Sequence, residues 1–133
     1  MDEILEYLKK NPTYYLATVD AEGNPQVRPF GTIAKVNGAL YIQTGMVKDV
    51  YKQIAAHPRA ALCTFDHEAG TWLRVEADLV PDDSTETCDA VLNDYPNLRS
   101  MYTPGDGNCV ALRLDNIHAT VSSFTAPTRE IEA

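Results

Sequence analysis

Apolar and polar residues alternate along much of the chain with the two-residue period of β-strands. Asn37-Gly38, placed between two short apolar runs, is a strong β-hairpin signal. Strands are predicted at 13–20, 25–35, 39–44, 59–65, 71–80, 109–114 and 117–124. Because they are short and mostly hairpin-linked, we expect a closed or nearly closed antiparallel barrel of six or seven strands. The alternation is clearest over residues 71–80, where one side carries Leu73, Val75, Ala77 and Leu79 and the other carries Trp72, Arg74, Glu76 and Asp78.

Three short segments follow the helical period instead. Residues 2–10 form the first, with Asp2 as the expected N-cap. The run Asp83-Ser84-Thr85-Glu86 resembles a capping box and predicts a helix that Pro96 ends. The polar tail from Thr125 onward is predicted to be loose. The expected buried residues are Ile4, Leu5 and Leu8 in the first helix and Cys88, Val91, Leu92 and Tyr95 in the later one.

The remaining helix, expected over residues 47–56, carries a lysine in its first turn. A cation is mildly disfavoured at a helix N-terminus, where unpaired N–H groups and a partial positive charge are suited to an anion. In a chain of net charge -8, Lys48 at this place predicts a phosphate site. The alternative is a solvated surface lysine. The apolar stripe expected to face the core is Val47, Val50, Tyr51, Ile54 and Ala55.

The composition of the chain excludes several classes of function. A chain of 133 residues with 44% hydrophobic and 23% charged residues indicates one soluble globular domain spanning residues 1–133. The acidic balance argues against nucleic-acid binding, and no apolar run is long enough to span a membrane. Without a secretory signal at the N-terminus, a cytoplasmic location is expected. The three cysteines are expected to be buried free thiols, and the three histidines lack metal-ligand spacing, so no metal site is predicted.

Several short motifs follow one another in a set order along nearly the whole chain. They are Tyr15-Leu16-Ala17-Thr18, Pro25-Gln26-Val27-Arg28-Pro29-Phe30-Gly31, Gly38-Ala39-Leu40-Tyr41, the run from Thr44 to Pro58, Trp72-Leu73-Arg74 and Ser100-Met101-Tyr102. In this order and spacing the chain resembles the small members of the pyridoxamine 5'-phosphate oxidase-like family, the flavin-binding split barrels. The resemblance implies a six-stranded antiparallel split β-barrel with about three short helices. It also implies a homodimer that holds FMN in the groove between protomers.

The same resemblance implies roles for individual residues. Arg28, Pro29 and Phe30 would pass along the flavin, with Arg28 towards its phosphate or ring edge. Gln43 and Thr44 would run beneath the flavin, and Lys48 would bind its phosphate. Trp72 and Arg74 would line the cleft and contribute to the second protomer's site. The alternatives are a solvated strand residue for Arg28, a core or interface aromatic for Trp72, a cross-strand ion pair for Arg74 and a helix cap for Thr44. The role of Tyr102 stays open between a site residue and a core tyrosine with one solvent-exposed end.

The function implied is that of an FMN-dependent oxidoreductase of unassigned substrate, with no catalytic residue assigned. NAD(P)H or a small-molecule electron acceptor would bind only transiently, since the chain has no dinucleotide fingerprint. Pyridoxamine phosphate oxidation is not expected, because the arginine- and histidine-bearing C-terminal segment of the vitamin B6 oxidases is missing from 127–133. The alternatives are a non-catalytic protein of the same fold that binds flavin, haem or another ligand, and a structural dimer without a cofactor.

Overall fold

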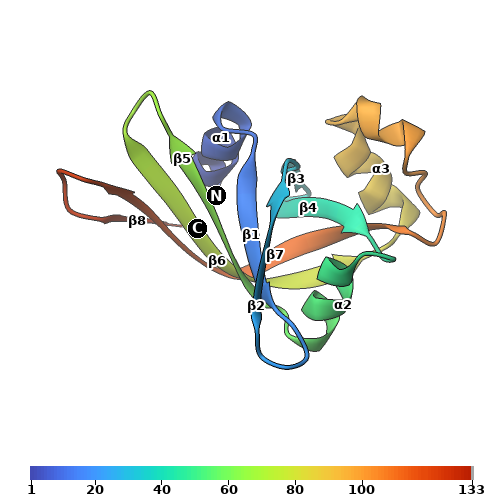
Figure 1. The fold of residues 1–133 in the computed structure, drawn as a ribbon. Helices are drawn as coiled ribbons and strands as arrows, with labels where there is room; N and C mark the ends of the chain where they lie inside the picture. Colours follow the sequence, from blue (N-terminus) through green and yellow to red (C-terminus); the bar gives the residue numbers. More distant parts are fainter. Residues whose placement is uncertain (133) are drawn as a thin grey trace.

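The structure is a computed structural model that describes residues 1–132, and it is mainly β, as expected (Figure 1). Six of its eight strands have six or more residues, and the other two have three each. The strands are β1 (Tyr14–Val19), β2 (Pro25–Phe30), β3 (Ala34–Val36), β4 (Ala39–Gly45), β5 (Arg59–Asp66), β6 (Thr71–Asp82), β7 (Cys109–Ser123) and β8 (Arg129–Ile131). The helices are α1 (Asp2–Lys10), α2 (Asp49–Ala56), α3 (Thr85–Asn93) and the short 3-10 helix η1 (Pro96–Ser100).

All strand pairings are antiparallel, in the order β2-β1-β5-β6-β7-β4-β3, with β8 added beside β7. The sheet curls around one core, but β2 pairs only with β1. After β2 the chain crosses through residues 31–33 to the β3–β4 hairpin at the other end of the sheet. The barrel is therefore open between β2 and the β3–β4 hairpin, and we call this opening the split.

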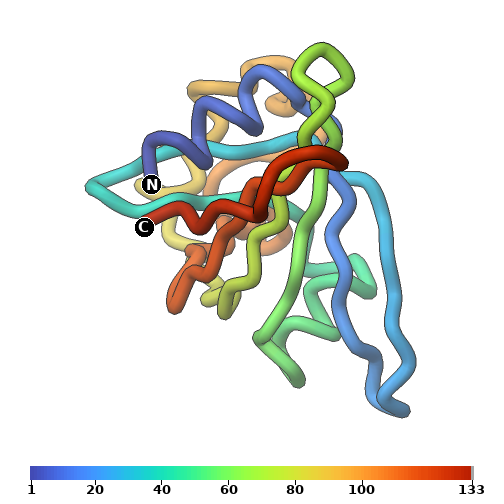
Figure 2. Tube along the Cα trace, turned by 90° about the vertical axis from the view of Figure 1, so that its left-hand side faces the viewer, coloured from blue at the N-terminus to red at the C-terminus, as the bar shows by residue number. Residues whose placement is uncertain are grey.

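Inward-facing apolar residues of the strands form the core, and the helices cover its ends. Leu16, Leu73 and Leu112 are fully buried there, and each contributes roughly 1.5–3 kcal/mol by burial. Helix α1 adds Ile4 and Leu8 to this core, while α3 packs outside the barrel against β3, β4 and β7. The two termini lie side by side (Figure 2), and the Met1 amino group donates to the Glu132 carbonyl at 3.3 Å.

Three predicted features of the strands and the tail were wrong, and so was the predicted burial of one cysteine. The strand expected at 25–35 is broken at Gly31-Thr32-Ile33, because this segment leaves β1 and crosses the split. The two strands expected at 109–114 and 117–124 are one strand, β7, which stays paired to β6 past an irregularity near Asn116. The tail is not loose, because β8 returns along β7. Cys63 is exposed, since its side of β5 faces away from the core.

The helices also differ from the predicted boundaries. Asp2 lies inside α1, with Met1 at the N-cap position, and α3 is capped by Ser84, whose hydroxyl accepts from the Thr87 amide at 3.3 Å. Helix α2 starts at Asp49, so Lys48 is its N-cap residue and does not belong to its first turn. Val47 precedes the helix and is exposed, as is Ala55, so only Val50, Ile54 and the half-buried Tyr51 face the core.

Candidate functional site

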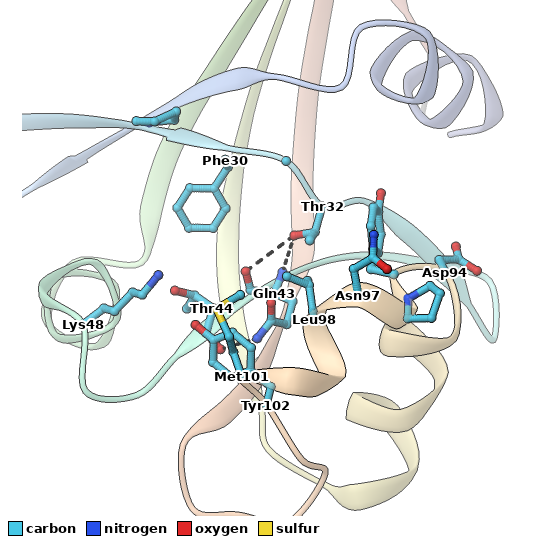
Figure 3. A pocket seen from close by; sticks show the side chains of 14 residues that line it. Phe30, Thr32, Gln43, Thr44, Lys48, Asp94, Asn97, Leu98, Met101 and Tyr102 are labelled. Carbon is cyan, nitrogen blue, oxygen red and sulfur yellow. Dashed lines mark hydrogen bonds between the residues drawn. The ribbon is translucent and has the colours of Figure 1, made fainter.

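The principal pocket of the described chain lies in the split and has a volume of about 530 Å³ (Figure 3). This size falls in the roughly 300–1,000 Å³ of small-molecule sites. Three segments surround it: the end of β2 with the crossover, the end of β4 with the turn into α2, and the chain from the end of α3 through η1. The lining residues are Pro29, Phe30, Gly31, Thr32, Gln43, Thr44, Lys48, Asp94, Tyr95, Pro96, Asn97, Leu98, Met101 and Tyr102.

The end of β4 forms the buried polar part of the pocket. Thr32, on the crossover, holds this strand in place: its hydroxyl accepts from the Gln43 amide at 2.9 Å and donates to the Gln43 carbonyl at 3.5 Å. The Gln43 side-chain nitrogen donates to the Thr44 carbonyl at 2.9 Å and more weakly to the Cys109 sulfur at 3.7 Å. The Gln43 side-chain oxygen and the Thr44 hydroxyl have no hydrogen-bond partner within residues 1–132, so both are available to a ligand.

Lys48 provides the positive charge at one end of the pocket. Figure 3 shows its amino group reaching toward Phe30, with Asp94 at the opposite end of the pocket. No carboxylate of the described residues lies within ion-pair distance of Lys48, although the chain is strongly acidic. Lys48 is the N-cap residue of α2, and no side chain caps that helix end. An anionic group of a ligand is therefore favoured here by both a full charge and the helix dipole.

Most lysines and arginines of the chain form an ion pair with a carboxylate of the described residues. Of its 11 lysines and arginines, four form no ion pair with a described residue. These four are Arg28, Lys48, Lys52 and Arg74, and all but Lys52 are residues that the sequence resemblance assigned to the site. The cross-strand ion pair considered for Arg74 does not form among the described residues, because the residues opposite Arg74 on the neighbouring strands are Cys63 and Thr120. Arg59 pairs with the acidic residues of β6, Glu76 and Asp78.

Arg28 lies behind the pocket rather than on its lining. Its guanidinium donates to the Leu16 carbonyl at 3.3 Å, the Thr18 hydroxyl at 2.7 Å and the Gln53 side-chain oxygen at 2.7 Å. Burial lowers the pKa of Arg28, and the nearby Asp49 carboxylate acts in the opposite direction. Arg28 therefore ties β2 to β1 and to α2, the helix whose N-cap is Lys48.

Trp72 and Arg74 do not line the pocket. Both face outward from β6, on what we call the outer sheet face: the outward-facing residues of β2, β1, β5 and β6. Strand register places Pro29, Tyr15, Cys63 and Arg74 in one row across this face. Trp72 belongs to an aromatic cluster with Phe65 and Phe124, whose ring centroids lie 6.4 and 5.1 Å from its own.

The third wall of the pocket, apart from Tyr102, whose role stayed open, was not predicted as part of the site. Tyr95 was expected on the buried face of α3, but the helix ends at Asn93 and the ring turns toward the crossover. The Tyr95 hydroxyl accepts from the Ile33 amide at 2.9 Å and donates to the Ile33 carbonyl at 3.0 Å. Lys9 lies 4.5 Å above the ring centroid. The signal available in the sequence was Tyr95-Pro96, since the proline ends the helix and leaves the tyrosine free to turn.

The pocket thus combines one cation, several free hydrogen-bonding groups and an apolar surface from Pro29, Phe30, Leu98 and Met101. This combination suits a flat, largely apolar ligand that carries an anionic group. Five residues of the expected site line it together: Pro29, Phe30, Gln43, Thr44 and Lys48.

Comparisons with known proteins give a consistent result. A sequence model described as Pyridoxamine 5'-phosphate oxidase matches residues 1–109. The chain is similar to a solved NimC/NimA family protein from Clostridium acetobutylicum, with 30% identity and a TM-score of 0.91 over 98% of this chain and 90% of that one. No curated protein sequence matches the chain.

Two further structures share the fold at lower identity. General Stress Protein 26 from Bacillus anthracis is 16% identical, with a TM-score of 0.71 over 98% of this chain and 97% of that one. An F420 reductase is 23% identical, with a TM-score of 0.57 over 84% of this chain and 94% of that one. No helix in the described part of the chain is long and apolar enough to cross a membrane.

Proposed function

The chain belongs to the pyridoxamine 5'-phosphate oxidase family, and on this premise we propose that it binds FMN in the split and acts as a homodimeric, flavin-dependent oxidoreductase. The observation that carries the proposal is the unpaired Lys48 at the start of α2, beside a pocket with a largely apolar surface. FMN has the matching chemistry, because it joins a dianionic phosphate to a flat, largely apolar ring.

The residues of the pocket fit this cofactor. Lys48 offers a charge-assisted hydrogen bond to the phosphate, and the free Thr44 hydroxyl lies on the strand that leads to it. Phe30 and Met101 offer apolar surface to the ring, while the Gln43 side-chain oxygen is free to accept from a ring N–H. FMN would be held non-covalently, because no cysteine of the described residues lines the pocket.

The protein's contribution is binding, orientation and exclusion of water, whereas bound FMN supplies the electron-transfer chemistry itself. Thr32 fixes the main chain of Gln43, so the side chains on β4 are held before a ligand arrives. Tyr95 fixes the wall formed by η1 against the crossover, which keeps the apolar side of the pocket in place. An electron donor or acceptor would enter at the exposed side, past Met101.

The partner in this proposal is a second copy of the chain. The outer sheet face exposes Tyr15 and Val27, which retain 54% and 67% of their accessible surface. It continues into the split through Pro29, which both lines the pocket and belongs to the row with Arg74. A copy seated on this face would cover the apolar residues and bring its own Trp72 and Arg74 toward the neighbouring pocket.

Spectroscopy of the purified protein tests the function. An FMN protein shows the two flavin absorption bands, and titration of the apoprotein with FMN restores them. Reduction of the bound flavin by NADH or NADPH, followed by reoxidation with a quinone, a nitro compound or oxygen, separates an oxidoreductase from a protein that only binds flavin. A colourless protein that takes up no FMN would contradict the proposal.

Lys48→Ala is expected to weaken FMN binding roughly 10- to 100-fold, or about 1.5–3 kcal/mol, because it removes a charge-assisted phosphate contact. Riboflavin, which lacks the phosphate, should bind both proteins equally. Lys52→Ala is the matched control, since Lys52 lies one turn along the same helix, also without an ion pair among the described residues, but does not line the pocket. Equal weakening of FMN and riboflavin by Lys48→Ala would show that Lys48 does not contact the phosphate.

Tyr15→Asp is expected to convert the dimer into a monomer at micromolar concentration, because it places a charge in the middle of the outer sheet face. If the partner completes the pocket, FMN affinity falls with it, by at least about tenfold. Sedimentation with and without FMN measures both effects. Ala55→Asp, on the exposed side of α2, is the control and should remain dimeric. A wild-type monomer of 14.7 kDa that binds FMN tightly would contradict the shared site.

A further inference from the structure

Tyr102 is a buried residue of the pocket whose hydroxyl has no hydrogen-bond partner among the described residues. The residue keeps only 8% of its surface accessible, yet its hydroxyl makes no hydrogen bond to any residue from 1 to 132. No fully buried side-chain oxygen or nitrogen of the described chain lacks a partner, so the Tyr102 hydroxyl keeps some accessible surface, and Tyr102 lines the pocket. Buried tyrosine hydroxyls normally find a partner. This one therefore has a place for a ligand atom.

The ring of Tyr102 is held firmly by its neighbours. It packs in a small cluster with Cys88, Leu92 and Cys109, and its own amide donates to the Leu98 carbonyl at 2.9 Å. On the other side it lies against the main chain of Gly45. A Cβ atom added to that glycine would be only 3.1 Å from the ring carbon Cε1. The hydroxyl is consequently fixed in position before any ligand binds, which lowers the entropy cost of using it.

This packing also places the hydroxyl at the Lys48 end of the pocket. Cε1 is the ring atom next to the carbon that carries the hydroxyl, and it touches the residue between Thr44 and the turn that leads to Lys48. In Figure 3, Tyr102 and Met101 lie below Thr44, on the side of the Lys48 turn and away from Asp94. Asn108 fixes the same turn, because it accepts from the Met46 amide at 2.7 Å and from the Val47 amide at 3.1 Å.

Three groups able to donate hydrogen bonds therefore gather at one end of the pocket: the Lys48 ammonium and the hydroxyls of Thr44 and Tyr102. None of the three has an acceptor in the described chain. A group made only of acceptors and carrying negative charge satisfies them together, and a phosphate monoester has this chemistry.

We infer that the Tyr102 hydroxyl donates a hydrogen bond to the phosphate group of the ligand that Lys48 binds, so that Tyr102 is a phosphate-binding residue of the site. The inference rests on the proposed FMN site and extends it, because it adds a neutral donor on a separate structural element, the chain after η1. Phosphate binding would then join β4, α2 and η1 around one ligand group.

The test compares FMN with riboflavin on wild-type apoprotein and on Tyr102→Phe. The substitution keeps the ring, so the packing against Gly45 is retained. FMN affinity is expected to fall about tenfold, while riboflavin affinity should change by less than about twofold. Tyr41→Phe is the control, since Tyr41 is equally buried beneath α3 but does not line the pocket, and it should leave both affinities unchanged. Circular dichroism and the thermal midpoint establish that each variant is folded.

The outcomes separate the two proposals. Unchanged FMN affinity in Tyr102→Phe, with tight binding by the wild type, overturns the role of Tyr102 and leaves the FMN site standing. Equal weakening of FMN and riboflavin also overturns it, because the hydroxyl would then contact a part that both ligands share. A wild-type protein that binds neither ligand overturns the proposed function itself. If Tyr102→Phe does not fold, the ³¹P chemical shift of FMN bound to the wild type is measured instead. A chemical shift equal to that of free FMN would overturn the role of Tyr102, because it excludes a phosphate held by these donors.

Discussion

Replacing Gly45 with valine is expected to lower the free energy of unfolding by about 2–4 kcal/mol and to weaken ligand binding in the split. A Cβ atom at this position would lie 2.9 Å and 3.1 Å from the side-chain oxygen and nitrogen of Asn108 and 3.1 Å from the ring of Tyr102. The asparagine cannot move away freely, because its oxygen accepts from the Val47 amide. Displacing it would also loosen the turn that carries Lys48.

Denaturant unfolding and FMN titration of Gly45→Val measure the two effects. Gly31→Val is the control for stability, because a Cβ at Gly31 meets its nearest atom, the Pro12 carbonyl oxygen, at an ordinary 3.7 Å. The control should unfold within about 1 kcal/mol of the wild type. A Gly45→Val protein as stable as Gly31→Val would show that the close packing of Gly45, Asn108 and Tyr102 does not constrain the site.

Tyr95→Phe is expected to destabilise the protein by about 2–4 kcal/mol, although it removes a single oxygen atom. That hydroxyl bonds both the amide and the carbonyl of Ile33, and a buried polar group left without a partner costs about 1–3 kcal/mol. The loss of stability should be seen locally, at Ile33, as well as in the free energy of unfolding of the whole protein. The Ile33 amide is expected to exchange its hydrogen faster, because the wall formed by η1 is no longer held against the crossover.

Hydrogen exchange followed by NMR measures the local effect, and denaturant unfolding measures the global one. Tyr51→Phe is the control: this tyrosine is also half-buried, but its hydroxyl makes no hydrogen bond with the described residues. Its unfolding free energy should stay within about 0.5 kcal/mol of the wild type. Unchanged exchange at Ile33 in Tyr95→Phe would mean that other contacts hold the crossover.

The sequence was sufficient to predict the parts of the fold that depend on local periodicity. The β6 alternation was confirmed residue by residue, with Leu73, Val75, Ala77 and Leu79 buried. The Asn37-Gly38 hairpin was confirmed as well, and both residues have the positive φ that its turn requires, 50° and 80°. The predicted strand boundaries were wrong where pairing with a neighbouring strand sets the point at which a strand ends. Nothing local in residues 25–35 indicates where the chain leaves β1, and β7 stays continuous because β6 runs beside it.

The same distinction applies to the site. Lys48, Gln43, Thr44, Pro29 and Phe30 could be proposed from sequence because they lie on two segments with recognisable motifs. The contribution of α3 and η1 could not, because it depends on Tyr95 reaching Ile33, 62 residues away in the sequence. Trp72 and Arg74 face outward from β6, and any role of theirs in the site would need a second chain, so this role remains a prediction that belongs to the proposed homodimer.

The two prolines of β2 have a consequence for how a ligand reaches the split. Pro25 and Pro29 face the same way as Val27 in the β1 register, and a proline within a strand has its nitrogen on the side without a partner. Of the three main-chain nitrogens along this edge, only that of Val27 can donate. Because this edge of β2 has so few donors, it does not form a ladder of hydrogen bonds with β4 or with a strand of another molecule. Entry to the pocket should therefore need no detachment of strands, and association should be limited by diffusion and by the positioning of the ligand.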